Sequence, residues 1–559
     1  MTTLTTPQRP RVMRWRLIDV LIAGVAVILI LVGVLRLSAA DTGLTREAVE
    51  LPEAPLTVAR PAYARQAPTV VIAHGFSGSR QMMQPFAMTL ARNGYVTINF
   101  DFPGHGANPR PLEGEIGEPR RAQILLEALT AVVDYATGLP HYDGRLALLG
   151  HSMGGDIAVR YARSAAGPEG SAPSGDPEAG ASAGSGPQPD HAVVRGAAGN
   201  VDALVAVSPY LSEEIGAFRP GNSPENLLFI YGEWEPAMIH QQGREAVAAV
   251  AGIASEAVET DVTYGEHAGG SARRLVIADS VEHIGVLYSQ QALESTLRWL
   301  NQVFDHPGSG WIDGRGLWLG IYFLGVILLA RPLARLLPRV SAEPLGAGLG
   351  WRQLLPAAIL PAVLTPLILR PFPSDFLSIA LADYIALHFA VYAMLSGAAM
   401  LLLSRGRAGK QSKTSLSAFV IALIAVVSYQ ALTIALPTDW YVAAFLPDPH
   451  RGLILTVLFA ATALWFGVDE WLTRGAGAAR GAYALTKAMF LLSLMLAVAL
   501  DLEQLFFLVI IIPAVLILFV VFGLFSGWIY RQTGHPLVAA LANALALAAA
   551  ITASFPIAG

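Results

Sequence analysis

The sequence contains no cysteine in its 559 residues. This absence excludes disulfide bonds, thiolate catalysis and cysteine-held metal sites, so any nucleophile must be an oxygen or a nitrogen. Charged residues are also scarce, at 14% against about 25% in soluble proteins. The formal net charge is −5 and no long basic tract is present. The chain therefore lacks the positive surface on which nucleic-acid binding depends.

Hydrophobic residues make up 54% of the sequence, and the mean hydropathy is +0.50. The first apolar run, residues 17–35, is long enough to span a bilayer and follows four arginines. A cleaved signal peptide is the alternative, but the run is long for one, and residues 36–38 make a poor cleavage site. We therefore expect residues 1–38 to form a cytoplasmic N-terminus and a retained transmembrane anchor.

Further apolar segments of spanning length follow residue 311, so that we predict about nine spans in total. The later eight are expected at 313–331, 353–370, 376–403, 415–437, 452–471, 483–500, 504–527 and 536–555. With the N-terminus inside, the cytoplasmic connections carry most of the arginines and lysines, and the outer ones carry mainly acids. The sequence thus predicts a multi-pass protein of a plasma (inner) membrane, with residues 311–559 as an eight-span transmembrane domain.

Residues 39–310 have the composition and pattern of a globular domain, with charged residues, turns and short β-branched runs. The topology places this domain outside the cytoplasm. Its residues 164–189 are almost wholly Gly, Ala, Ser, Pro and acids, and we expect them to form a disordered loop. A mobile lid is the alternative for this loop.

Three short strand patterns open the domain, at 69–73, 95–100 and 145–149. The third runs into Gly-His-Ser-Met-Gly-Gly at 150–155 and then into a helical pattern at 156–163. A strand, G-x-S-x-G and a helix form the context that a nucleophile elbow requires. The glycines are needed because the serine sits in a strained turn between closely packed elements.

Later strands supply possible partners for Ser152. Residues 226–231 lead into Glu233 and Glu235, and residues 274–278 lead toward His283. Parallel strands gather such positions on one rim of a sheet. Serine, acid and histidine in this order follow the triad of the α/β-hydrolase family, which residues 55–303 resemble. The expected fold is therefore a mostly parallel sheet with flanking helices, joined to an α-helical transmembrane bundle.

The resemblance implies a role for each site residue. Ser152 would be the nucleophile, His283 the general base and later acid, and Glu235 the carboxylate that orients the imidazole. The backbone N–H groups of Phe76 and Met153 would form the oxyanion hole. No cofactor is implied, and no histidine shows a metal-ligand spacing.

Some assignments have rivals. The family usually has aspartate where Glu235 stands, so Glu233 and Asp261 remain alternatives for the acid. His267 and His151 compete for the role of base, although neither follows a strand end. Only a short segment separates the strand at 204–207 from the next one. We therefore expect no cap domain, and the membrane bundle is the candidate cover for the site.

Ionisable and polar residues also fall inside the predicted spans: Asp383, Tyr384, His388, Tyr429 and Gln430. Such residues are costly in lipid. They predict either a polar network that fixes helix packing or a polar cavity for a lipid headgroup or an ion.

Together these features predict a membrane-embedded serine hydrolase, esterase- or lipase-like, acting on an ester or other acyl linkage through an acyl-enzyme. A hydrophobic or lipid-linked substrate is expected from the attached spans. Acyl transfer to an extracytoplasmic acceptor is one alternative. A transport or scaffold protein with a non-catalytic, hydrolase-like binding domain is another.

Overall fold

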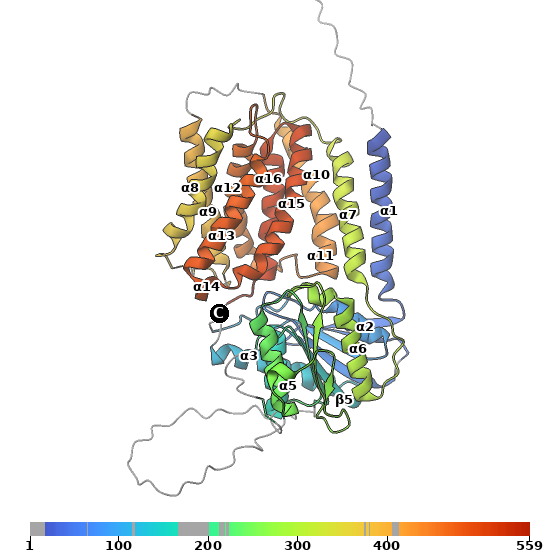
Figure 1. Ribbon diagram of the computed structural model, residues 1–559. Helices are drawn as coiled ribbons and strands as arrows, with labels where there is room; N and C mark the ends of the chain where they lie inside the picture. The colour runs from blue at the N-terminus through green and yellow to red at the C-terminus, as the bar shows by residue number, and fades with distance from the viewer. Residues whose placement is uncertain are drawn as a thin grey trace, which may run out of the picture.

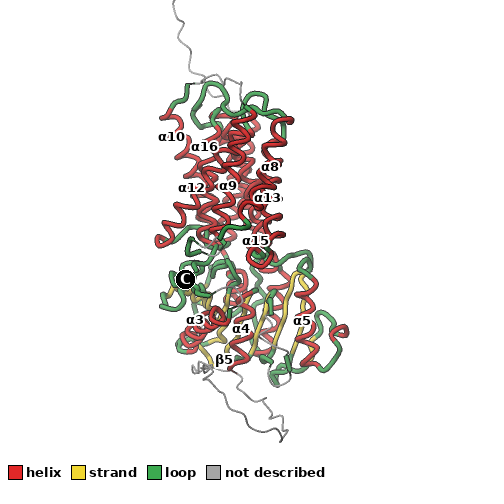
Figure 2. The backbone as a smooth tube through the Cα atoms, turned by 90° about the vertical axis from the view of Figure 1, so that its left-hand side faces the viewer, coloured by secondary structure: helices red, strands yellow, loops and turns green. Residues whose placement is uncertain are grey.

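The computed structural model describes residues 17–63, 65–114, 118–165, 201–211, 218–219, 223–373, 376–379, 381–404 and 413–558. Most of the loop predicted at 164–189 and the N-terminal residues 1–16 lie outside these ranges. The described chain has two parts stacked end to end (Figures 1 and 2). We call them the sheet domain, which runs from β1 to α6, and the helical bundle, which comprises α1 and α7 to α16.

The sheet domain contains one nine-stranded sheet in the order β1-β2-β4-β3-β5-β6-β7-β9-β8. Its six central strands are parallel, whereas the two strands at one edge and the single strand at the other pair antiparallel. The strands are β1 (Leu44–Val49), β2 (Leu56–Pro61), β3 (Ala67–Ala73), β4 (Val96–Phe100), β5 (Tyr142–His151), β6 (Ala203–Val207), β7 (Leu227–Gly232), β8 (Thr263–Tyr264) and β9 (Arg273–Ala278). The six parallel strands are those that the sequence predicts, and this fold class is confirmed.

Helices cover both faces of the sheet. On one face, α3 (Pro119–Thr137), α4 (Met153–Ala165) and α5 (Ala237–Ala251) pack into one apolar core. On the other, α2 (Gln84–Arg92) and α6 (Gln290–Phe304) pack into a second core. Every residue of β3 is buried, because the two cores lie on opposite sides of it. This double burial explains the uninterrupted apolar run in its sequence.

In the described part of the chain, nine helices are long and apolar enough to cross a membrane, as predicted. They are α1 (Leu17–Ala39), α7 (Arg315–Ala334), α8 (Trp351–Leu369), α9 (Ala382–Leu403), the span Leu416–Tyr441, α12 (Gly452–Thr473), α13 (Ala482–Leu500), α15 (Leu508–Thr533) and α16 (Pro536–Ser554). The span Leu416–Tyr441 contains α10 (Leu416–Gln430), a π-helical turn and α11 (Leu436–Tyr441). A short helix, α14 (Leu502–Leu505), precedes α15.

The sheet domain lies at the same end of the bundle as α11, α14 and the C-terminal residues (Figure 1). At the far end, Arg335 after α7 donates to Asp19 near the start of α1. Asp19 is fully buried by this pairing and packing. The basic residues of the described connections, Arg335, Arg339, Arg474, Arg480 and Arg531, lie at this same end, which faces away from the sheet domain.

Part of the predicted intramembrane polar set forms a packing network. Gln430 donates to Asn543 at 2.8 Å, and Asn543 donates to Ser526 at 2.9 Å. The Tyr429 hydroxyl donates to the carbonyl of Val326. These bonds join four helices, α7, α10, α15 and α16, because each donor reaches across a helix interface.

Other polar groups of the bundle are buried differently. Asp383 accepts from the backbone N–H of Leu377 at 3.0 Å. His388 is fully buried, and neither ring nitrogen has a hydrogen-bond partner within the described ranges. Lys487 of α13 donates to Asp469 of α12, and both are buried. The two spans are thus joined by an ion pair that the sequence pattern does not reveal.

Candidate active site

Ser152 occupies the sharp turn between β5 and α4. Its φ is +52°, in the left-handed region that non-glycine residues rarely adopt. The flanking glycines make the turn possible. A Cβ on Gly150 would lie 2.2 Å from the carbonyl oxygen of Gly154, and one on Gly154 would lie 2.5 Å from that of His74. The G-x-S-x-G pattern therefore has a steric cause at this site.

The structure brings Ser152, His283 and Glu235 into one hydrogen-bonded chain. The Ser152 Oγ lies 3.0 Å from His283 Nε2, and His283 Nδ1 lies 2.5 Å from Glu235 Oε1. The three side chains come from segments after β5, β9 and β7, which follow the carboxyl ends of parallel strands in the same sheet. Residues far apart in sequence meet here because those strand ends share one rim of the sheet.

Glu235 is held by two further donors. Its Oε2 accepts from the Ser208 hydroxyl and from the Gly232 backbone N–H, each at 2.8 Å. The Glu235 side chain has no exposed area. Ser208 follows the end of β6, and no feature of the sequence beyond that position indicates this role. With both oxygens bonded, the carboxylate has a fixed orientation toward the imidazole.

The rival acids lie elsewhere. Glu233 accepts from the backbone N–H of Ser280 at 2.8 Å and is exposed. Asp261 forms an ion pair with Arg274 at 3.0 Å. Neither carboxylate is bonded to His283 by any contact within the described part of the chain. Glu235 is thus the acid that the geometry favours.

The rival histidines also have other partners. The His267 ring packs against Trp299 at a centroid distance of 4.8 Å. His151 Nε2 lies 2.9 Å from the His283 carbonyl oxygen, so it donates there and supports the turn that carries His283. Burial, and then the neighbouring His283, lower the pKa of His151 to about 3. His151 therefore stays neutral and has a supporting position behind the hydrogen-bonded chain.

A histidine also fixes the loop that carries Phe76. The Phe102 backbone N–H donates to His74 Nε2 at 3.1 Å, so the ring proton lies on Nδ1, which donates to the Gly75 carbonyl at 2.8 Å. Burial lowers the pKa of His74, which favours this neutral form. A Cβ on Gly75 would lie 2.9 Å from the Cβ of Ser152. The loop can approach the serine this closely because it has glycine at that position.

A small cavity of about 20 Å³ opens beside Ser152 and His283. Its walls include Phe76, Met82, Met83 and Ile284 of the sheet domain. Phe507, from the turn between α14 and α15, also lines it. The cavity has room for about one water molecule. The helical bundle therefore contributes directly to the wall of the candidate active site, which is the kind of cover that we expected for a domain without a cap.

The two parts of the chain are also joined next to this cavity. Arg451, which is fully buried before α12, donates to the carbonyls of Thr552 and Phe555 at 2.7 and 2.8 Å. It also donates to the carbonyl of Gly104 in the sheet domain at 2.7 Å. The Ile557 backbone N–H donates to Gly104 at 2.9 Å, and its carbonyl accepts from Leu112. One guanidinium and the C-terminal segment thus bind the loop that follows β4.

Comparisons with known proteins give one family match and several similar solved structures. Residues 64–172 match the family model described as serine aminopeptidase S33. Similar solved structures include dienelactone hydrolase from Anabaena variabilis, at 17% identity and TM-score 0.29, covering 48% of this chain and 99% of that one. Another is the esterase LipW from Mycobacterium marinum, at 17% identity and TM-score 0.30, covering 52% and 89%.

A bacterial membrane phospholipase A is also similar, at 14% identity and TM-score 0.30, covering 52% of this chain and 95% of that one. No curated protein matches the sequence. The family match includes the Ser152 turn, and the strand order carries serine, acid and histidine in the order of the α/β-hydrolase triad. The sheet domain has the α/β-hydrolase fold, and it is joined to a bundle of helices that are apolar enough to span a membrane.

Proposed function

We propose that this protein is a membrane-embedded serine hydrolase, esterase- or lipase-like, that cleaves an ester or other acyl linkage. The observation that carries the proposal is the hydrogen-bonded chain from Ser152 through His283 to Glu235. A serine hydroxyl is a weak nucleophile until an adjacent base takes its proton. His283 lies within reach to do so, and Glu235 orients it.

In the proposed mechanism, Ser152 Oγ attacks the carbonyl carbon while His283 Nε2 accepts the hydroxyl proton. The Glu235 carboxylate stabilises the imidazolium that forms. The backbone N–H groups of Phe76 and Met153 stabilise the oxyanion. His283 then gives its proton to the leaving group, which departs and leaves an acyl-enzyme. Water activated by His283 releases the acid and restores Ser152.

The surroundings of the cavity support a hydrophobic or lipid-linked acyl substrate. The cavity walls include Phe76, Met82, Ile284 and, from the bundle, Phe507. An acyl chain coming from the bilayer would meet Phe507 before it meets bulk water. The distribution of basic residues favours an extracytoplasmic sheet domain, with the basic end of the bundle in the cytoplasm.

The test is labelling of the purified full-length protein with a fluorophosphonate probe, which reacts only with an activated serine. We expect wild type to be labelled, and Ser152→Ala and His283→Ala to lose the label. Ser280→Ala changes an exposed serine near His283 and should label as wild type does. If well-folded wild type is not labelled even by a small probe, or if Ser152→Ala keeps the label, the proposal is wrong.

A further inference from the structure

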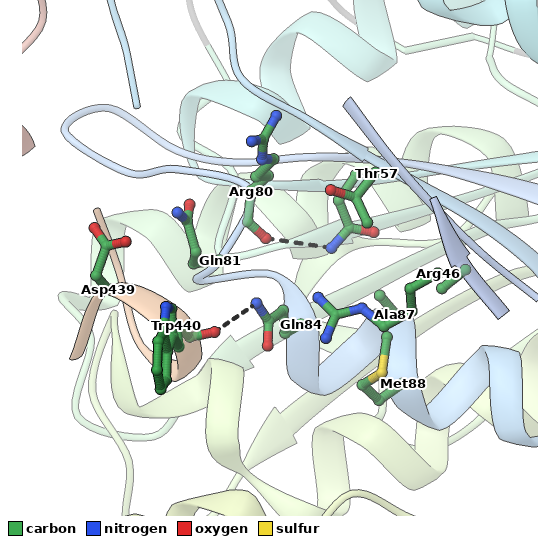
Figure 3. Close-up of a pocket in the computed structure, with 11 residues that line it drawn as sticks. Arg46, Thr57, Arg80, Gln81, Gln84, Ala87, Met88, Asp439 and Trp440 are labelled. Carbon is green, nitrogen blue, oxygen red and sulfur yellow. Dashed lines mark hydrogen bonds between the residues drawn. The ribbon is translucent and has the colours of Figure 1, made fainter. Parts of the chain in front are cut away.

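A second, larger cavity lies between the sheet domain and the bundle (Figure 3). Its volume is about 190 Å³, enough for about six water molecules. Its walls come from β1, β2, β4 and the α2 region on one side and from α11 on the other. Its lining includes Arg46, Arg80, Gln81, Gln84, Asp439 and Trp440.

Two arginines lie on one side of this cavity. The Arg46 guanidinium points toward Gln84 in Figure 3, and its ion pair with Asp41, at 3.1 Å, lies on the exposed rim. Arg80 also lines the cavity, and its guanidinium is paired with the buried Asp101 at 3.6 Å, while its Nη1 is buried without a hydrogen-bond partner among the described residues. Gln81 Oε1 is likewise buried and has no hydrogen-bond partner among the described residues. Guanidinium forks bind phosphate oxygens strongly, so an anionic phosphate suits this side.

The opposite side can accept a cation. Asp439 Oδ1 accepts the backbone N–H groups of Phe445 and Leu446 at 2.9 and 3.1 Å, which fixes the carboxylate and leaves Oδ2 for a ligand. The neighbouring Trp440 side chain is 57% exposed. Its carbonyl accepts from Gln84 at 3.0 Å, so the residue is anchored while its indole lies at the cavity. A carboxylate beside an indole suits an ammonium group.

The place of the cavity indicates where such a ligand would come from. Asp439 and Trp440 end the span Leu416–Tyr441, at the bundle end nearest the sheet domain (Figure 1). Tryptophan at the end of a span typically lies at the level of the lipid headgroups.

We propose that this cavity binds a zwitterionic phosphate–ammonium headgroup, of the phosphoethanolamine type, from a membrane lipid. The phosphate lies toward Arg46 and the ammonium toward Asp439 and Trp440. The assignment does not depend on the proposed hydrolase activity. The two cavities nevertheless share one segment of the chain. Gly78, Met82 and Met83 line the Ser152 cavity, and Arg80, Gln81 and Gln84 line this one.

The test measures binding to the full-length protein in detergent by calorimetric titration. The probes are dihexanoyl phosphatidylethanolamine, dihexanoyl phosphatidylglycerol, which has the phosphate without the ammonium, and free phosphoethanolamine. Arg46→Gln should weaken both lipids at least about tenfold, since each loses a charge-assisted bond. Asp439→Asn should weaken the ethanolamine lipid by a similar factor and leave the glycerol lipid unchanged. Arg120→Gln, at an exposed arginine paired with Glu113, is the matched control.

The outcomes separate the alternatives. If free phosphoethanolamine competes with the ethanolamine lipid at equal concentration, the headgroup chemistry is correct and a soluble ligand is its source. If it competes only at large excess, the source is the bilayer. Absence of saturable binding to folded wild type overturns the proposal, as does equal binding by Arg46→Gln. If Arg46→Gln aggregates, Arg46→Lys replaces it in the test. This variant keeps the positive charge but removes the planar guanidinium fork, so it should still weaken the binding of both lipids.

Discussion

Phe507 of the helical bundle packs its ring against Phe76 of the sheet domain, with 4.4 Å between the ring centroids. Phe76 belongs to the loop that approaches Ser152, and both aromatic residues line the cavity beside it. The bundle and the proposed oxyanion loop are therefore in direct contact. A change at this contact should alter what reaches the serine.

Replacing Phe507 with alanine should open the cavity. We expect kcat/KM for a small soluble ester such as p-nitrophenyl acetate to rise several-fold, because less of the site is covered. For a long-chain ester presented in vesicles we expect a fall of about fivefold, since an aromatic contact of about 1 kcal/mol is lost. Both are measured by steady-state hydrolysis.

Phe506→Ala is the control for that experiment. Phe506 precedes Phe507 and is 49% exposed, and it does not line the cavity. It should leave both substrates within about twofold of wild type. Equal behaviour of the two variants would show that Phe507 does not govern access.

The acid of the hydrogen-bonded chain can be identified by paired substitutions. Glu235→Gln keeps the shape but removes the charge that stabilises the imidazolium, so kcat should fall by on the order of 1,000- to 10,000-fold. Glu233→Gln changes an exposed carboxylate with a different partner and should stay within about threefold of wild type. If kcat fell strongly in Glu233→Gln and not in Glu235→Gln, Glu233 would be the acid and Glu235 would not.

His151 should make the fold sensitive to acid. Its pKa of about 3 in the folded state lies below about 6.5, the value for an exposed histidine. As pH falls below 6.5, the unfolded chain takes up the proton first, so the free energy of unfolding decreases until about pH 3. Each pH unit in this window costs up to about 1.4 kcal/mol.

His151→Gln tests this, because glutamine can still donate an N–H toward the His283 carbonyl. The loss of stability between pH 7 and pH 5, followed by thermal unfolding, should be about 2 kcal/mol smaller in the variant. His74 and His105 also have lowered pKa values through burial, so some acid sensitivity should remain. An unchanged pH dependence would contradict the role of His151.

Arg451 should be difficult to replace by lysine. Its planar fork reaches the carbonyls of Thr552, Phe555 and Gly104 at once, which a single ammonium cannot reproduce. We expect Arg451→Lys to lower the melting temperature by several degrees and to reduce fluorophosphonate labelling. Arg370→Lys, at an exposed arginine after α8, should match wild type. Equal melting temperatures would show that the junction does not depend on the fork.

The sequence indicates the parallel strands and the positions of Ser152, Glu235 and His283 after strand ends, and the reason is local. Ser152 lies in a pattern of strand, turn and helix that is contiguous in the chain, and its partners each follow an apolar run. The edge strands β1 and β8 escape sequence reasoning because one is charged and partly exposed and the other has two residues. Such strands carry no uninterrupted apolar signal.

Contacts between the two parts of the chain could not be predicted in this way. Phe507 and Phe76 meet only through the tertiary arrangement, as do Arg451 and Gly104. Each of these residues taken alone is an ordinary turn or span-end residue. Ser208 was visible as a strand-end residue, but its bond to Glu235 depends on the order of β6 and β7 in the sheet.

The bonds of Ile557 to Gly104 and Leu112 set an order for biosynthesis. Domains generally fold as they leave the ribosome, from the N-terminal side onward. The loop after β4, however, cannot gain these partners until α16 and the segment that follows it have been synthesised. Folding of the sheet domain can therefore be completed only after the helices of the bundle have been made.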